Sequence, residues 1–205
     1  MSIVENMKRI EERINRACER VHRDRNSVTL VIAGKYATAD QLWDVFRAGG
    51  MVIGENKVQD ARDKKPLLDP RVRWHMIGHL QTNKVKQAIG LFDMIHAVDS
   101  LRLAAEINKQ SGKVMRVTDC LLEVNIAGEK SKYGFKPAEV VRSFEAIASL
   151  QNVRILGLMC MAPYDDDPEK SRVHFRALAD LRDELQHRFL KAQLPHLSMG
   201  MTQDF

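Results

Sequence analysis

Short apolar runs recur along the chain, and amphipathic helical patterns separate most of them. Residues 4–21 place apolar side chains at spacings of three and four between Arg, Glu and Lys, which predicts an N-terminal amphipathic helix. The run 28–34 is apolar and β-rich, so we expect a strand there that is buried on both faces. Thr38 precedes Gln41 at capping-box spacing, and Gly49-Gly50 closes the helical pattern that follows.

The same strand, loop and helix unit continues down the chain. Further apolar runs that fit strands are 51–53, 72–77, 94–98, 120–124, 155–160 and 197–199. Helix starts are indicated by Ser100 as a cap, by Pro137, and by Asp167 before Pro168. Strands that alternate with helices form a parallel sheet with right-handed crossovers, covered by helices.

Seven such strands predict an α/β fold of the (β/α)8 TIM-barrel class. A doubly wound nucleotide-binding sheet is the alternative, but no Gly-x-Gly-x-x-Gly turn follows the first strand. The count leaves the eighth strand unaccounted for. No Pro/Gly/Ser-rich linker interrupts the pattern, so we expect residues 1–205 to form a single domain.

Composition agrees with a folded globular chain, because 44% of the residues are hydrophobic and 29% are charged. No stretch reaches 18 apolar residues, which argues against a membrane span. Residues 1–9 carry charges where a signal peptide needs an apolar core, so a cytoplasmic location is expected. Cys18, Cys120 and Cys160 are odd in number and far apart, which argues against a disulfide framework or a structural zinc site.

The charge excess is mild. The chain has 32 basic and 27 acidic residues, a formal net charge of +5. Lys and Arg are scattered beside Glu and Asp, and no row of aromatic residues accompanies the densest basic segments. We therefore interpret the charges as solvated helix faces and expect neither a nucleic-acid nor a membrane partner.

Candidate chemistry is expected where the strands end, because the active face of a (β/α)8 barrel lies at the carboxyl ends of its strands. Lys35 directly follows the run 28–34, so its stem is expected among buried strands. Desolvation there would favour the neutral amine, which attacks a carbonyl to form a Schiff base. The alternative is a lysine that snorkels to solvent. Asn56, Ser198 and Gly200 could supply an amide, a hydroxyl and backbone N–H groups to a phosphate, although caps and turns use the same residue types.

No metal site is expected. His75 and His79 are four residues apart, but Trp74–Ile77 reads as a strand, in which that spacing spans about 13 Å and places the imidazoles too far apart to share a metal. Asp165–Asp167 precede Pro168 and a long helical pattern, so they are interpreted as a helix N-terminus. No catalytic residue is assigned.

Several segments carry a resemblance to a known family. They are Lys35 after its strand, 54–59, 74–84, 124–126, Ser131-Lys-Tyr-Gly-Phe135, 157–162 and Leu197-Ser-Met-Gly-Met201. In this order, along essentially the whole chain, they resemble the pyridoxal phosphate homeostasis protein family, which is similar to the N-terminal barrel of alanine racemase. The resemblance implies pyridoxal 5′-phosphate (PLP), a form of vitamin B6, as cofactor and Lys35 as its Schiff-base lysine. It also implies that Asn56, Ser198, Met199 and Gly200 lie against the cofactor and its phosphate.

The chain departs from the family pattern in two places. Gly34 and Tyr36 stand where the family usually has a small hydroxyl residue before the lysine and a threonine after it. The family also continues beyond 197–201 with a helix and an eighth strand, which carry an Arg opposite the pyridine nitrogen and a Gly-Thr phosphate contact. We therefore expect a barrel without its last strand and helix, and weaker cofactor binding.

Two functional classes follow from the resemblance. The first is a non-enzymatic protein of PLP homeostasis, a monomer or weak homodimer that holds PLP and can pass it to PLP-dependent apo-enzymes. The second is a racemase-like or decarboxylase-like enzyme that uses the same cofactor. Racemisation needs a second acid/base on the opposite face, which racemase-like enzymes draw from an added domain, so the binding protein is favoured. A phosphate-binding barrel that never forms the Schiff base is a third interpretation.

The loop 128–134 offers one further hypothesis. Lys130 or Lys132 could transiently accept the aldehyde of PLP as it enters or leaves the site. The alternative is a solvated basic loop.

Overall fold

The computed structural model describes residues 2–129 and 132–205. The chain divides into two compact units, Met1–His75 and Met76–Phe205. Each unit builds its own part of the strand and helix alternation predicted from the sequence.

The first unit contains three helices and the first strands. Its helices are α1 (Ile3–Arg20), α2 (Ala39–Arg47) and α3 (Val58–Lys64). β1 (Ile32–Ala33) pairs in parallel with β2 (Val52–Glu55), and β3 (Arg73–Met76) begins with a hydrogen bond from its first N–H to the carbonyl of Met51. α1 confirms the helix expected over 4–21, although it begins and ends one residue earlier, and it packs against α2.

The predicted cap of α2 is confirmed. Thr38 Oγ1 accepts from the backbone N–H of Gln41 at 3.2 Å, and Gln41 Oε1 accepts from the N–H of Thr38 at 2.9 Å. The reciprocal bonds satisfy two donors that a helix N-terminus leaves free. Gly49 ends the segment with a positive φ of 94°, a conformation that glycine adopts at little cost.

The prediction of a fully buried strand over 28–34 was wrong. Only Ile32–Ala33 pair with β2, and Ala33 is exposed. Before them, Asp24 caps a short 3-10 turn over Arg25–Ser27, and the Arg25 side chain donates to the carbonyl of Val28. Val28, the first residue of the apolar run, is thus held by a side chain rather than by a strand ladder.

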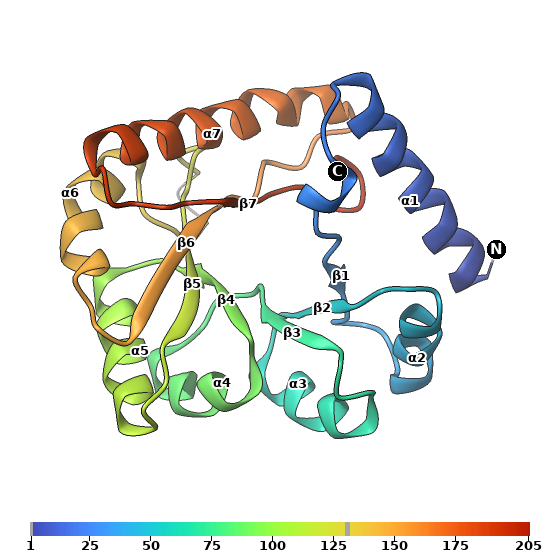
Figure 1. Cartoon of the computed structure of the whole chain (residues 1–205), viewed down its shortest axis with the longest axis horizontal. Coiled ribbons are helices and arrows are strands. Elements are labelled where there is room, and N and C mark those ends of the chain that lie inside the picture. Colours follow the sequence, from blue (N-terminus) through green and yellow to red (C-terminus); the bar gives the residue numbers. More distant parts are fainter. Residues whose placement is uncertain (1, 130–131) are drawn as a thin grey trace. The chain divides into compact units, whose positions relative to one another are not determined.

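The second unit is a parallel sheet in which neighbouring strands follow chain order. Its strands are β4 (Met94–Val98), β5 (Thr118–Glu123), β6 (Val153–Met159) and β7 (His196–Ser198). Its helices are α4 (Val85–Leu91), α5 (Leu101–Lys113), α6 (Pro137–Ala148) and α7 (Ser171–Arg188). In Figure 1, α7 runs alongside β7, and α5 and α6 flank β5 and β6. The alternation expected of an α/β fold is present.

Local sequence signals set the starts of these helices. Ser100 Oγ accepts from the N–H of Leu103, and Pro137 is the first residue of α6, as predicted. Asp167 caps a 3-10 turn that begins at Pro168 and leads into α7. These three starts depend on contacts within a few residues, which is why the sequence reveals them.

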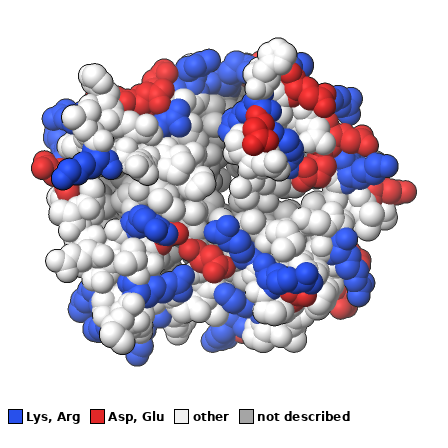
Figure 2. All heavy atoms as spheres, in the orientation of Figure 1, with Lys and Arg blue, Asp and Glu red and all other residues white. Residues whose placement is uncertain are grey.

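The surface carries both charges. Figure 2 shows Lys and Arg side chains interspersed with Asp and Glu over the face in view. Within the described ranges, no helix combines the length and the apolar character that crossing a membrane requires. Cys18, Cys120 and Cys160 are each buried and unpaired.

Candidate functional site

Lys35 lies in a tight turn at the carboxyl end of β1. The N–H of Gly34 donates to the carbonyl of Gly54 at 2.8 Å, and the N–H of Ala37 donates to the carbonyl of Gly34 at 2.9 Å. Lys35 itself is exposed, and its Nζ lies 5.0 Å from the ring centroid of Tyr36. The predicted burial of Lys35 was therefore wrong, because the chain turns away from the sheet directly after Gly34. The amine is accessible to a dissolved aldehyde.

A buried ion pair lies beneath this turn. Glu55, the last residue of β2, has a side chain with no exposed surface, and Lys64 Nζ lies 2.8 Å from its Oε1. Lys64 Nζ also donates to the carbonyl of Gly34 at 2.7 Å. Sequence reasoning missed this pair. A buried Glu needs a cation as its partner. Lys57, Lys64 and Lys65 all follow closely, so the sequence does not indicate which of them pairs with Glu55.

Asn56 links β2 to α3 and is half-buried. The cap position of α3 belongs to Lys57, and no side chain makes a cap hydrogen bond there. The Asn56 amide therefore does not cap α3, which was the alternative role for it.

Ser198 ends β7, and a buried histidine contacts its hydroxyl. Ser198 Oγ lies 2.9 Å from Nδ1 of His96 on β4, and the Ser198 carbonyl accepts from the N–H of Cys160 at 3.0 Å. Met199 is exposed, and Gly200 has a positive φ of 90°. The sequence contains a signal for His96, a lone polar residue in an apolar strand, but does not reveal its partner.

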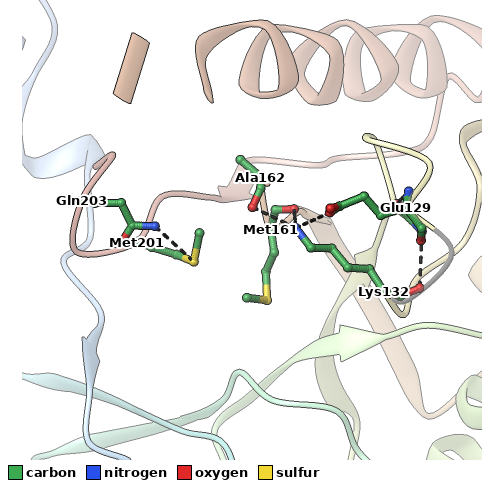
Figure 3. Close-up of polar contacts among 7 residues, drawn as sticks. Glu129, Lys132, Met161, Ala162, Met201 and Gln203 are labelled. Atoms are coloured by element: carbon green, nitrogen blue, oxygen red, sulfur yellow. Dashed lines mark hydrogen bonds and ion pairs between the residues drawn. The ribbon is translucent and has the colours of Figure 1, made fainter. Parts of the chain in front are cut away.

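A carboxylate holds the residues after this turn. Asp204 Oδ1 accepts from the backbone N–H of Met201, and Asp204 Oδ2 accepts from the Ser171 hydroxyl at 2.8 Å. Figure 3 shows Met201 in this part of the chain, with the Gln203 amide directed towards its sulfur atom. The turn 198–201 is thus fixed at both ends.

A second polar cluster in the same unit brings together residues that follow β3, β4 and β5. His79 Nδ1 lies 3.0 Å from Asp99 Oδ2, and the Tyr133 ring stacks on the His79 ring with centroids 3.8 Å apart. Burial, with a smaller contribution from the charge of Asp99, raises the pKa of Glu123 to about 7. This carboxyl is therefore protonated over part of the neutral range.

The raised pKa of Glu123 predicts a pH-dependent stability. The folded protein binds a proton on Glu123 that the unfolded chain, with a pKa of 4.5, has released. The resulting stability is complete below pH 4.5 and is lost as the pH rises towards 7. We expect Glu123→Gln to raise the free energy of unfolding at pH 8 by about 2–3 kcal/mol and to leave it nearly unchanged at pH 4. Urea unfolding at both pH values measures this, and an equal change at both would contradict it.

Lys132 is held by three oxygen atoms. Its Nζ lies 3.0 Å from the carbonyl oxygen of Ala162, 3.3 Å from that of Met161 and 2.6 Å from Glu129 Oε2 (Figure 3). A transient bond between Lys132 and an aldehyde would require these contacts to break and the ammonium to lose a proton. Lys130, the other lysine of that hypothesis, lies outside the described residues.

Metal ligands do not gather in the part of the chain that the structure describes. No group of three or more His, Cys, Asp or Glu side chains there is arranged to hold a metal ion. Asp165 instead accepts from the backbone N–H of Asp167 and from Lys170 Nζ, each at 3.0 Å.

Comparison with known proteins identifies the fold. Residues 6–205 match the family model of the alanine racemase N-terminal domain. An alanine racemase of Clostridium difficile aligns with a TM-score of 0.69 at 12% identity, over 86% of this chain and 46% of that one. This α/β fold is therefore the alanine racemase N-terminal fold.

Nearer relatives narrow the assignment. The pyridoxal phosphate homeostasis protein of Aquifex aeolicus is 44% identical over 206 residues, which span 100% of this chain and 90% of the relative. The structure of PipY from Synechococcus elongatus with PLP bound aligns with a TM-score of 0.82 at 31% identity, over 93% of this chain and 90% of that one. The chain belongs to the pyridoxal phosphate homeostasis protein family.

Proposed function

We propose that this protein binds PLP as a Schiff base on Lys35 and serves intracellular PLP homeostasis. The observation that carries the proposal is the exposed amine of Lys35, in a hydrogen-bonded turn at the carboxyl end of β1. In the neutral form, the amine attacks the aldehyde carbon of PLP. A carbon–nitrogen double bond forms, and the carbonyl oxygen leaves as water. PLP bound to PipY and the naming of the Aquifex relative support the cofactor.

The turn after β7 suits a phosphate. Ser198 offers a hydroxyl, and Gly200, with a positive φ of 90°, lets the backbone of the turn approach a ligand closely. We assign Asn56, Ser198, Met199 and Gly200 to the cofactor because the family resemblance places them against it. In this proposal, residues 1–205 form a single PLP-binding barrel domain.

The proposed role is that of a carrier. A Schiff base stores the reactive aldehyde reversibly, since water releases it and a competing amine can exchange with it. The protein would thereby buffer PLP in the cytoplasm and supply it to PLP-dependent apo-enzymes. No catalytic residue is assigned, and racemisation of amino acids is the alternative activity.

The proposal is tested by titrating the purified protein with PLP. A visible absorption band of a Schiff base should saturate at one PLP per chain, and borohydride reduction followed by peptide mapping should place the adduct on Lys35. Saturable binding without this band or adduct would contradict the Schiff base and favour a phosphate-binding protein. Reduction that labels another lysine at full stoichiometry would contradict the assignment to Lys35.

An assay with alanine separates the carrier from the enzyme. We expect L- or D-alanine to be racemised no faster by the PLP-loaded protein than by the same concentration of free PLP. Racemisation needs a second acid/base on the opposite face of the cofactor, which racemase-like enzymes draw from an added domain. Chiral chromatography over several hours measures this. Sustained racemisation that Lys35→Ala abolishes would contradict the carrier role.

A further inference from the structure

The Glu55–Lys64 pair contacts the residue that immediately precedes Lys35. Lys64 Nζ bridges Glu55 Oε1 at 2.8 Å and the Gly34 carbonyl at 2.7 Å. That carbonyl is also the acceptor that closes the turn to the N–H of Ala37. A single ammonium therefore joins the end of β2, the end of α3 and the first carbonyl of the turn.

Burial keeps this ammonium in place. The side chain of Glu55 has no exposed surface and that of Lys64 is 18% exposed. Among the described residues, Glu55 Oε2 has no hydrogen-bond partner, so the carboxylate depends on its contact with Lys64 through Oε1. A buried carboxylate that loses its cation is strongly destabilised, which opposes any movement of Lys64 away from it.

The pair also leaves no space at Gly34. A Cβ placed on Gly34 would lie 2.8 Å from Glu55 Oε1, closer than such contacts tolerate. Gly34 stands where the family usually has a small hydroxyl residue. Here the Glu55 carboxylate packs directly against the backbone at this position. The Gly34 N–H donates to the Gly54 carbonyl, the Gly34 carbonyl accepts from Lys64, and Glu55 Oε1 occupies the space that a side chain at this position would need.

We propose that Lys64, paired with Glu55, is a positioning residue for Lys35. By holding the Gly34 carbonyl, Lys64 fixes the turn from which the long Lys35 side chain extends, and thereby the region that its amine can reach. A fixed start lowers the conformational cost of bringing the amine to the aldehyde. This inference rests on the proposed Schiff base at Lys35.

The test compares two ligands that differ only at the reacting group. PLP bonds to Lys35, whereas pyridoxine 5′-phosphate has an alcohol in place of the aldehyde and cannot. The variants are Lys64→Met and the double variant Glu55→Gln/Lys64→Met, which leaves no unpaired buried charge. We expect both to lower the PLP affinity and the rate of Schiff-base formation about tenfold, as for loss of a hydrogen bond to a charged group. The affinity for pyridoxine 5′-phosphate should stay unchanged.

The matched control is Arg62→Met, on the same helix. Arg62 is exposed and pairs with Asp63 at 2.9 Å, so this variant removes a positive charge from α3 without touching the turn. It should bind both ligands like the wild type. Far-UV circular dichroism and thermal melts establish whether each variant is folded. If Lys64→Met is not folded, the double variant is used for the test.

The outcomes separate the two proposals. An unchanged PLP affinity and rate in a folded double variant, while the wild type forms the Lys35 adduct, would overturn the positioning role and leave the proposed function standing. An equal loss of affinity for both ligands would also overturn it, since Lys64 would then act only on the fold. A wild type that forms no Lys35 adduct would overturn the proposed function and, with it, this inference.

Discussion

Lys35→Ala should abolish the borohydride-stable attachment of PLP and the visible Schiff-base band. We expect the apparent affinity for PLP to fall roughly a hundredfold, about 2.7 kcal/mol, because only the non-covalent contacts remain. The fold should be unaffected, since Lys35 is exposed and substitutions at such positions usually change the free energy of unfolding by less than about 0.5 kcal/mol. Absorption titration, reduction with mass spectrometry and a thermal melt measure these three quantities.

Lys8→Ala is the matched control, because Lys8 is an exposed lysine on α1. It should trap PLP at the wild-type stoichiometry. If Lys35→Ala also did so, the Schiff base would belong to a different lysine, and the role proposed for Lys64 would lose its basis.

Gly157→Ala should cause a large loss of stability, because it places a methyl group between two paired strands. Gly157 pairs with His196 where β6 meets β7, and a Cβ at this position would lie 1.8 Å from the His196 carbonyl oxygen. The strands cannot keep their spacing with an atom there. We expect the free energy of unfolding to fall by about 3 kcal/mol or more, as for severe overpacking of a core. Urea denaturation measures the loss.

The same substitution should reach the candidate phosphate contacts. β7 ends at Ser198, so a displaced β7 moves the Ser198 hydroxyl away from His96 and shifts the turn at Gly200. Hydrogen exchange of residues 196–201 should accelerate, and the affinity for pyridoxine 5′-phosphate should fall together with that for PLP. This pattern differs from the one expected of Lys64→Met, which should leave the affinity for pyridoxine 5′-phosphate unchanged.

Gly90→Ala is the control for adding a methyl group to a glycine. Gly90 lies within α4, and a Cβ there would meet no atom within 4 Å. Alanine also has the higher helix propensity, so the variant should be as stable as the wild type or more stable by less than about 1 kcal/mol. If Gly157→Ala lowered the free energy of unfolding no more than Gly90→Ala, β7 would be able to move aside without loss of stability, and the prediction would be wrong.

The alternation of strands and helices could be predicted from the sequence because it depends on short-range patterns. Each of the seven apolar runs overlaps an observed strand, and the caps at Thr38 and Ser100 act over three residues. The candidate lysine was found in the same way, since Lys35 is the first charged residue after an apolar run. These features need no knowledge of which distant segments meet.

The partners of the site residues were decided by tertiary structure. His96 and Ser198 are separated by 102 residues, and the apolar pattern places each in a strand without indicating that their side chains touch. The first apolar run has the composition of a buried strand, yet only Ile32–Ala33 pair, and Lys35 is exposed.

The buried charges show the same division. The sequence by itself predicted a strand over 51–53 and placed Glu55 just after it, without indicating that its side chain is buried. A buried carboxylate requires a cation, because it cannot remain charged and unpaired in the interior. Only the tertiary structure decided that Lys64 is that cation and that it also holds the Gly34 carbonyl. The physical reason is that periodicity reports the burial of a residue averaged over its segment, whereas the choice among nearby lysines depends on how the end of α3 packs against β1 and β2.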